Sequence, residues 1–333
     1  MKLTRRVTLR QLEIFCEAAS QPSFSAVAES LSLSQPAISM QIRQLEEAVG
    51  LALFEKSGRR KMLTEAGTRM YEHASRILGE VHDTEQSLLA LKGLETGSIT
   101  VGLVSTANNF APRLLAAFSQ LHPGIEVRFV VGNREALVSL LKENRTDLAV
   151  MGRPPGEIET VAESLADNPH VIVAPTSHPL CGRKRIALSQ LRGETFLQRE
   201  SGSGTRGVME DLFRAQRFKP LRILSLGSNE TVKQSVMAGL GLSVLSLHTL
   251  SLELRSGEIA CLDVVGLPLQ RSWHVVHLRR RPLSPAALAF RKFLVEQTQP
   301  YLSKHYADLM HVAHAGKTTS KRAAKPGRAR GNR

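Results

Sequence analysis

The sequence is poor in the residues that build disulfide frameworks and zinc sites. Its three cysteines, Cys16, Cys181 and Cys261, lie far apart and never form a C-x-x-C pair. Scattered cysteines in odd number are typical of reduced thiols in a cytoplasm. The pattern argues against a disulfide-stapled secreted protein, and we expect neither a metal site nor a tightly bound cofactor.

Long apolar runs are also missing. The basic N-terminus, residues 1–20, contains no apolar run long enough for a signal peptide. The most apolar later stretch, residues 236–254, is interrupted by Gly, Ser, Thr and His and is too polar to span a bilayer. We therefore expect a cytoplasmic protein.

Acidic residues are outnumbered. Thirty Asp and Glu against 44 Lys and Arg give a net charge of +14 over 333 residues, and such an excess indicates polyanionic partners. Part of it lies in the last segment, residues 314–333, which lacks core-forming residues and is predicted to be a disordered basic tail. Its basic residues are Lys317, Lys321, Arg322, Lys325, Arg328, Arg330 and Arg333.

Catalytic patterns are scarce. The sequence contains no G-x-S-x-G elbow, and none of its eleven histidines forms an H-E-x-x-H pair. The segment from Gly202 to Gly207 matches G-x-G-x-x-G, but only a short strand precedes it and no nucleotide-binding half comes before that strand. We therefore expect a protein that is not an enzyme.

Helical patterns at the N-terminus predict a helix-turn-helix. Apolar residues recur on one face over residues 8–19. Serine caps then open two further helices, one ending near residue 31 and the other, with Pro36 in its first turn, ending at Gly50. The tight turn at residues 32–34 between them completes the motif.

The third helix carries the residues expected to read DNA, because such a helix presents its N-terminal part to base edges in the major groove. Gln35, Ser39 and Arg43 share one face by their spacing of four. Glutamine suits adenine, whereas arginine suits guanine or a phosphate, so Arg43 is left with either role. Pro36 adds apolar contact, and Ser25 is assigned to the same surface. The alternative is an ordinary solvated helix face.

A basic hairpin, FEKSGRRKML, follows over residues 54–63. Wings of this kind lie along the phosphate backbone or reach the minor groove, where positive side chains are attracted. An exposed charged turn is the other interpretation. The candidate contacts are Lys56, Arg59, Arg60 and Lys61.

A single helix of about 40 Å is predicted from Thr64 to about Leu91. Its apolar residues recur at steps of three and four and form a narrow seam rather than a broad core face. Such a seam most often pairs with another helix, although a lone core helix would carry a similar pattern.

Beyond residue 93 strand-like and helical runs alternate, as in SITVGLV, IEVRFVV, HVIVAP and WHVVHL with helices between them. Alternation of this type predicts an α/β fold with parallel or mixed sheets. Ligands in such sheets bind at the carboxyl ends of the strands, in a cleft between lobes.

The segment FSAVAESLSLSQPAISMQIRQLEEAVGLALFEKSGRRKMLTEAG strongly resembles the LysR-type transcription regulators, and the likeness extends to about residue 301. Two further segments, LGSNETVKQSVMAGLGLSVLS and LQRESGSGTRG, resemble more narrowly the regulators of Calvin-cycle carbon-fixation operons. Two positions depart from the family pattern. Met40 replaces a common basic residue, and Lys56 replaces an arginine and so loses its bidentate fork.

The resemblance implies a winged helix-turn-helix over residues 1–63, a dimerisation helix over 64–92 and a periplasmic-binding-protein-like effector domain over 93–301. Its lobe I covers about 93–165 and 270–301, and its lobe II covers about 166–269. It further implies a homodimer or homotetramer that binds double-stranded DNA and a small-molecule effector, with RNA polymerase as a possible further partner. Whether the protein activates or represses is left open.

The predicted effector site gathers residues that follow strands or open helices in both lobes. Gly-rich turns at helix starts bind anions through free N–H groups, so we expect a small anionic effector, a phosphorylated metabolite or an NADPH-like nucleotide. A Gly-rich turn without a ligand and simple helix caps are the alternatives. The candidates are Ser105, Thr106, Arg134, Ser201, Ser203, Thr205, Arg206, Asn229 and Glu230.

Two other classes of protein share parts of this pattern. A solute-binding protein or enzyme could use the same lobes, but the helix-turn-helix and the missing catalytic motifs argue against it. A general nucleoid-type DNA binder could use the basic tail alone, and sequence-selective binding would separate it from a regulator.

Overall fold

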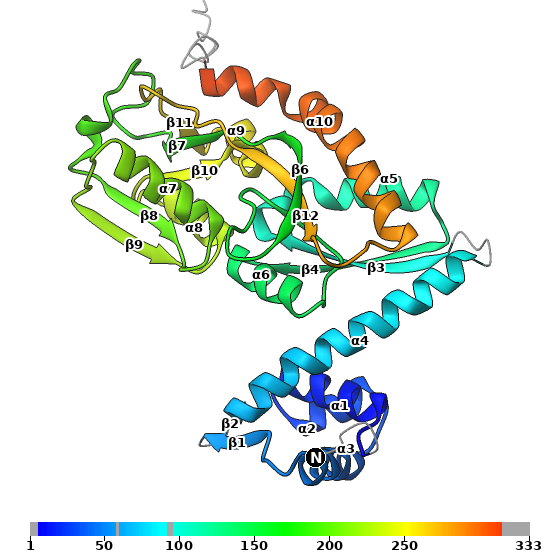
Figure 1. Cartoon of the computed structure of the whole chain (residues 1–333). Coiled ribbons are helices and arrows are strands. Elements are labelled where there is room, and N and C mark those ends of the chain that lie inside the picture. Colours follow the sequence, from blue (N-terminus) through cyan, green and yellow to red (C-terminus); the bar gives the residue numbers. More distant parts are fainter. Residues whose placement is uncertain (1–5, 58–59, 92–95, 315–333) are drawn as a thin grey trace, which may run out of the picture.

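The chain folds into a small helical domain, a long connecting helix and a two-lobed α/β body (Figure 1). It is described by a computed structural model covering residues 6–57, 60–91 and 96–314. Arg59 and, apart from His314, the predicted basic tail lie outside the described residues.

The N-terminal domain has the predicted helix-turn-helix and hairpin. Thr8, Ser23 and Ser34 each accept a hydrogen bond from the backbone of the helix they cap, and Gly50 ends the third helix in the left-handed region at φ 77°. Phe15 lies in the fully buried core beneath the helices. The elements are α1 (Leu9–Ser20), α2 (Phe24–Ser30), α3 (Gln35–Val49), β1 (Phe54–Ser57) and β2 (Arg60–Leu63).

The connecting helix α4 (Glu65–Leu91) has the predicted length, and the burial of its apolar residues changes along it. Ala74 is 1% exposed and packs into the core of the N-terminal domain. Ile77 and Leu88 are 46% and 55% exposed. At ~100° per residue these two side chains fall on one face, so the described chain leaves an apolar stripe on α4 without a partner.

Lobe I is built on a mixed sheet of order β4-β3-β5-β12-β6. The first three strands are parallel, and β12 runs antiparallel to both β5 and β6. The elements are β3 (Gly97–Val104), β4 (Ile125–Gly132), β5 (Leu148–Met151), β6 (Thr160–Asp167), β12 (Ser272–Leu278), α5 (Ala111–Leu121), α6 (Arg134–Lys142), α10 (Pro285–His314) and the 3-10 turn η2 (Ser105–Asn109).

Lobe II contains the sheet β10-β7-β11 and the parallel pair β8-β9, which a bridge between Phe196 and Leu242 joins. The chain passes between the lobes twice, and the two crossings lie side by side because His170 and Leu269 exchange backbone hydrogen bonds. The elements are β7 (His170–Pro175), β8 (Thr195–Arg199), β9 (Arg222–Leu226), β10 (Ser243–Ser246), β11 (Ile259–Cys261), α7 (Gly204–Ala215), α8 (Asn229–Met237), α9 (Ser251–Ser256) and the 3-10 turns η3 (Leu188–Leu191) and η4 (Leu247–Thr249).

Two features differ from the sequence-based expectation. Strand β6 was not predicted, because TVAESLAD mixes polar and apolar residues and has an irregular burial pattern. Helix α10 continues through Pro300 to His314, so the predicted end of the effector domain at residue 301 falls inside a helix. In the part of the chain that the structure describes, no helix combines the length and the apolar character needed to cross a bilayer.

The exposed stripe on α4 leads to a first prediction. Replacing Ile77 and Leu88 with Asp puts charges where a helix pair would bury them, so an oligomer held through α4 should dissociate at micromolar concentration. Both side chains are exposed in the single chain, so the protomer should stay folded. Sedimentation measures the mass, and Thr68→Asp on another exposed side of α4 is the control. Unchanged assembly in the double variant would contradict a pairing role.

Candidate functional site

The N-terminal half of α3 presents the residues expected to read DNA. Gln35, Pro36 and Arg43 are exposed, and Ser39 is half-buried. The Gln35 amide Nε2 donates to Ser39 Oγ at 2.9 Å, so the free helix holds these two side chains together. Ser25 is exposed on α2. The five predicted residues thus lie on the outer surface of the helix-turn-helix, where DNA would have access.

The hairpin contains the predicted basic residues, but Lys61 points inward. Its Nζ donates to the Ala18 carbonyl and lies 4.6 Å and 4.8 Å from the ring centres of Phe24 and Phe54. Burial lowers its pKa to about 8. Lys61 therefore stabilises the domain rather than facing DNA. Lys56 lies on β1 and Arg60 on β2, but their side chains are outside the described part of the structure. Arg59 is outside it altogether.

A cavity of about 400 Å³ lies between the two lobes. Its walls come from the carboxyl ends of strands in both lobes, where parallel sheets present loops and helix starts. Five of the predicted effector residues line it: Ser105, Thr106, Arg134, Ser203 and Thr205.

The other four predicted effector residues do not line this cavity. Arg206 turns along its own helix and pairs with Glu210 at 2.7 Å. Glu230 pairs with Lys233 at 2.8 Å, and Asn229 is buried at the start of α8. Ser201 lies at the rim, where its carbonyl is 3.5 Å from the Asn133 amide of lobe I.

Arg134 is already held by its own lobe. Its guanidinium donates to both carboxylate oxygens of Glu157 at 3.0 Å and to the carbonyl of Arg153 at 3.2 Å. The hydrogen bond from Arg134 is the main reason why the pKa of Glu157 falls to about 2. The arginine is therefore fixed in place at the cavity wall and carries a charge that is partly balanced.

The main cationic side chain that the sequence did not single out is Arg199, the last residue of β8. It is 4% exposed, lines the cavity and donates to Glu200 at 2.7 and 2.8 Å. Its terminal nitrogens also reach Ser105 Oγ in lobe I at 3.4 Å. Burial alone would raise the pKa of Glu200, but the hydrogen bonds and charge of Arg199 hold it below the usual value. Its position at a strand end is the signal that could have identified it.

The start of α7 faces the same cavity. Ser203 precedes the helix, yet its side chain makes no capping hydrogen bond, and Gly204 and Thr205 line the cavity beside it. The first N–H groups of a helix have no partner within that helix. An uncapped helix start next to a buried arginine is an arrangement that binds anions.

The floor of the cavity is formed by the lobe crossings. His170 and Trp273 line it and are almost wholly buried. Burial lowers the pKa of His170 to about 4, so its ring is neutral near pH 7 and adds no charge. Asp211 is the acidic residue among the lining side chains, and it contacts Arg153 at 3.5 Å and Arg271 at 3.3 Å. Four arginines and one aspartate thus surround the space.

Within the described residues, no group of three or more His, Cys, Asp or Glu is arranged to hold a metal ion.

Two family models match the chain. Residues 9–68 match the "Bacterial regulatory helix-turn-helix protein, lysR family" model, and residues 92–299 match the "LysR substrate binding domain" model. The first match ends in the first turn of α4, and the second begins between α4 and β3, so most of α4 lies between the two matches.

Three known proteins are similar to the chain over most of their length. The regulator CfxR of Cupriavidus necator is 55% identical, covering 92% of this chain and 96% of that protein. A RuBisCO operon transcriptional regulator of Allochromatium vinosum is 48% identical, covering 87% and 96%. The solved regulatory domain of Synechocystis CcmR in complex with 2-PG is 39% identical, with a TM-score of 0.59, covering 61% of this chain and 98% of that domain.

The inward position of Lys61 predicts how it behaves in DNA binding. Each phosphate contact contributes about 0.9 to the log–log slope of affinity against salt. Lys61→Met should leave this slope unchanged and lower the melting temperature of the N-terminal domain. Arg43→Met removes an exposed charge from α3 and should make the slope shallower. Equal changes of slope in the two variants would show that Lys61 turns outward to reach DNA.

The buried His170 predicts a loss of stability in acid. Its folded pKa of about 4 lies below the unfolded value of 6.5, so the unfolded chain takes up the proton first as the pH falls. The contribution of His170 to the free energy of unfolding is therefore complete above pH 6.5. It falls by about 3 kcal/mol as the pH is lowered towards 4. Denaturant titrations at pH 7 and pH 4.5 measure it. His170→Gln should show a smaller acid loss than the parent, and an equal loss would contradict the assignment.

Proposed function

The chain belongs to the LysR family of DNA-binding transcription regulators, and from that premise we propose that it controls carbon-fixation genes in response to a small anionic metabolite. It is a regulator and not an enzyme, with a helix-turn-helix that binds DNA and a domain that binds small-molecule effectors.

The carbon-fixation role is supported by the similar proteins. CfxR and the RuBisCO operon regulator of Allochromatium vinosum share 55% and 48% of aligned residues with this chain. The alignments cover both the helix-turn-helix and the lobed domain. This chain is therefore similar to these regulators in the part that reads DNA and in the part that senses a ligand. We propose that the genes under control are Calvin-cycle genes and that the protein acts in the cytoplasm.

The proposal of an anionic effector is supported mainly by one observation: a buried arginine and an uncapped helix start line the same cavity. Arg199 is 4% exposed, and the first turn of α7 beside it has no side-chain cap. A negative group placed between them would accept hydrogen bonds from both, and such charge-assisted bonds are strong where they are partly withdrawn from water. The phosphate of a phosphorylated metabolite fits this need, and 2-PG in the CcmR regulatory domain is such a compound.

The mechanism follows from the position of the site between the lobes. Ser105 and Thr106 belong to lobe I, whereas Arg199 and α7 belong to lobe II. A ligand that touches both sides binds one relative orientation of the lobes better than the other, and only such a difference shifts an equilibrium. The favoured orientation would then determine how the recognition helices of a dimer or tetramer meet the operator, and whether RNA polymerase is engaged.

The experiment uses the intact protein, promoter DNA from carbon-fixation genes and 2-phosphoglycolate as probe. Calorimetry should show binding to the parent, and Arg199→Gln should weaken it by at least about 10-fold, because hydrogen bonds to charged groups contribute ~1.5–3 kcal/mol. Mobility shifts should show that 2-phosphoglycolate changes promoter affinity in the parent but not in the variant. The matched control is Arg192→Gln, an exposed arginine of lobe II outside the cavity.

Two results would contradict the proposal. One is binding of 2-phosphoglycolate, sugar phosphates and nicotinamide nucleotides that is equally strong in Arg199→Gln and in the parent. The other is a parent protein that binds only neutral or cationic compounds. Melting temperatures of all three proteins exclude simple unfolding of the Arg199 variant.

A further inference from the structure

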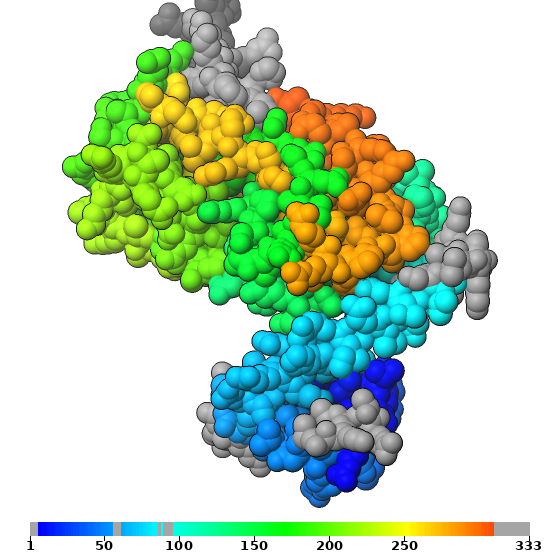
Figure 2. Space-filling model, viewed as in Figure 1, coloured from blue at the N-terminus to red at the C-terminus, as the bar shows by residue number. Residues whose placement is uncertain are grey.

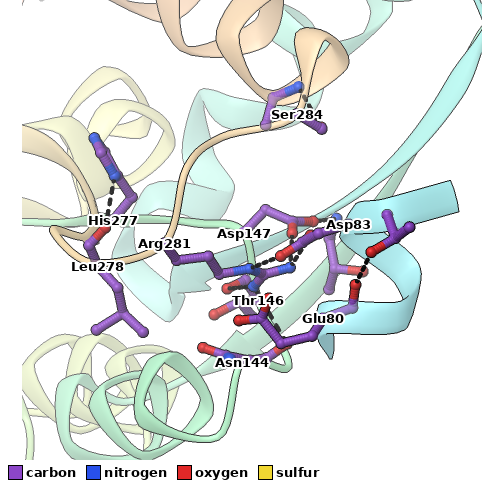
Figure 3. A network of polar contacts seen from close by, with 12 residues as sticks. Glu80, Asp83, Asn144, Thr146, Asp147, His277, Leu278, Arg281 and Ser284 are labelled. Atoms are coloured by element: carbon purple, nitrogen blue, oxygen red, sulfur yellow. Dashed lines mark hydrogen bonds and ion pairs between the residues drawn. The ribbon is translucent and has the colours of Figure 1, made fainter. Parts of the chain in front are cut away.

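Arg281 forms a buried ionic contact between α4 and lobe I, far from the effector cavity. Its side chain is 7% exposed and lies in the segment between β12 and α10 (Figure 3). Nε and Nη2 donate to the two carboxylate oxygens of Asp83 on α4, both at 2.6 Å. Nη2 also donates to Asp147 at 2.7 Å, and Nη1 donates to the carbonyls of Asn144 and Thr146. All five N–H donors of the guanidinium are therefore used.

Asp147 connects this contact to strand β3 of lobe I. Its second carboxylate oxygen accepts from the Thr100 N–H at 2.7 Å, and its own N–H donates to the Thr100 carbonyl at 2.8 Å. Thr100 belongs to β3. The connecting helix is thus bonded, through one arginine and one aspartate, to the backbone of the sheet that forms the effector cavity wall.

The contact is extended along α4 by a close approach at Gly79. A Cβ added there would lie 2.8 Å from Cβ of Asn144, so only glycine lets α4 come this near to lobe I. Asn144 itself is in the left-handed region at φ 55°, which turns the loop toward the helix. Further along, Arg145 donates to the Tyr71 hydroxyl at 2.5 Å. Residues 71, 79 and 83 share one side of α4, and the exposed stripe of Ile77 and Leu88 is on the opposite side at ~100° per residue.

The same strands reach both the Arg281 contact and the effector cavity. Residue 147 precedes β5, whose other end at Met151 lines the cavity. Arg281 follows β12, whose first residues, Ser272 and Trp273, form part of the cavity floor. Hydrogen-bonded strands in one sheet move as a rigid body, so a shift of lobe I on ligand binding is transmitted to its opposite edge.

We propose that this contact, here named the Arg281 latch and made of Arg281, Asp83, Asp147 and the Gly79–Asn144 approach, sets the orientation of the DNA-binding domain relative to lobe I. It makes α4 follow lobe I rather than lobe II. Effector binding between the lobes then turns the DNA-binding domain with lobe I. This last step rests on the function proposed above, whereas the orientation itself does not.

Local packing makes the latch a narrow contact rather than part of a broad interface. A cavity of about 270 Å³ lies beside the latch, between α4 and lobe I, and Arg281, Gly79 and Asp147 are among its lining residues. Figure 2 shows that α4 forms a narrow neck between the DNA-binding domain and the body. With so narrow a connection, a few buried polar contacts determine the orientation, and buried ion pairs are little screened by salt.

The first test compares Arg281→Gln with Arg280→Gln in the intact chain. Arg280 is the adjacent arginine and pairs with Glu159 on the surface, where its side chain is 84% exposed, so the control removes the same charge. Without any ligand, backbone amides of residues 76–85 and 143–147 should exchange with solvent at least 10-fold faster in Arg281→Gln and at the parent rate in Arg280→Gln. Equal exchange in the two variants would overturn the latch.

The second test separates the latch from the charge of Arg281. Gly79→Ala favours the helix but forces α4 away from Asn144, so it should accelerate exchange at residues 143–147. Asn144→Gly removes the clashing Cβ and suits the left-handed backbone, so the double variant should return to the parent rate. Failure of Asn144→Gly to rescue Gly79→Ala would overturn the close-approach part of the latch.

The third test measures the response to effector, with 2-phosphoglycolate as probe. Arg281→Gln should bind it within 2-fold of the parent, because the latch lies outside the cavity, but should lose at least three-quarters of its effect on promoter affinity. A full effect in Arg281→Gln would overturn the transmitting role. A parent that shows no response to 2-phosphoglycolate contradicts the proposed effector instead, and the exchange experiments then decide the latch alone.

Discussion

The placement of α4 against lobe I depends on the buried guanidinium of Arg281. Removing a charge from water costs several kcal/mol, and only a complete set of partners offsets that cost. Arg281 has such a set from two carboxylates and two carbonyls, contributed by α4 and by the loop before β5. Such a pair adds little net stability compared with an apolar contact. What it does provide is one defined geometry, since any other orientation of α4 leaves buried charges without partners.

The effector cavity also contains charged groups that already have partners, because each of its lining arginines is paired with a carboxylate. Arg134 is paired with Glu157, Arg199 with Glu200, and Arg153 and Arg271 with Asp211. A single weak negative charge gains little by competing with these carboxylates. A ligand with two or more negative charges gains more, because it also reaches the uncapped start of α7. Under the proposed function, this balance favours phosphorylated compounds over simple monocarboxylates.

The sequence predicted the parts that depend on local chemistry. The helix-turn-helix was predicted from its serine caps, from Pro36 in the first turn of α3 and from Gly50 after it. The length of α4 was predicted from apolar residues that recur at steps of three and four. It missed what depends on long-range contacts. Nothing near Lys61 in the sequence indicates that its amine turns back to the Ala18 carbonyl. Asp83, Asp147 and Arg281 are separated by 64 and 134 positions in the chain, so their meeting depends on the tertiary fold.

In the proposed mechanism, an anion bound in the cavity and an operator bound on α3 are linked through one two-state arrangement. Linkage between two binding sites is reciprocal. If the ligand changes the affinity of the protein for the operator by some factor, the operator must change the affinity of the protein for the ligand by the same factor. The direct measurement is a calorimetric titration of 2-phosphoglycolate into the free protein and into its operator complex. The proposed mechanism predicts two affinities whose ratio equals the change in operator affinity seen in mobility shifts. Identical affinities, alongside an operator affinity that responds to the ligand, would contradict it.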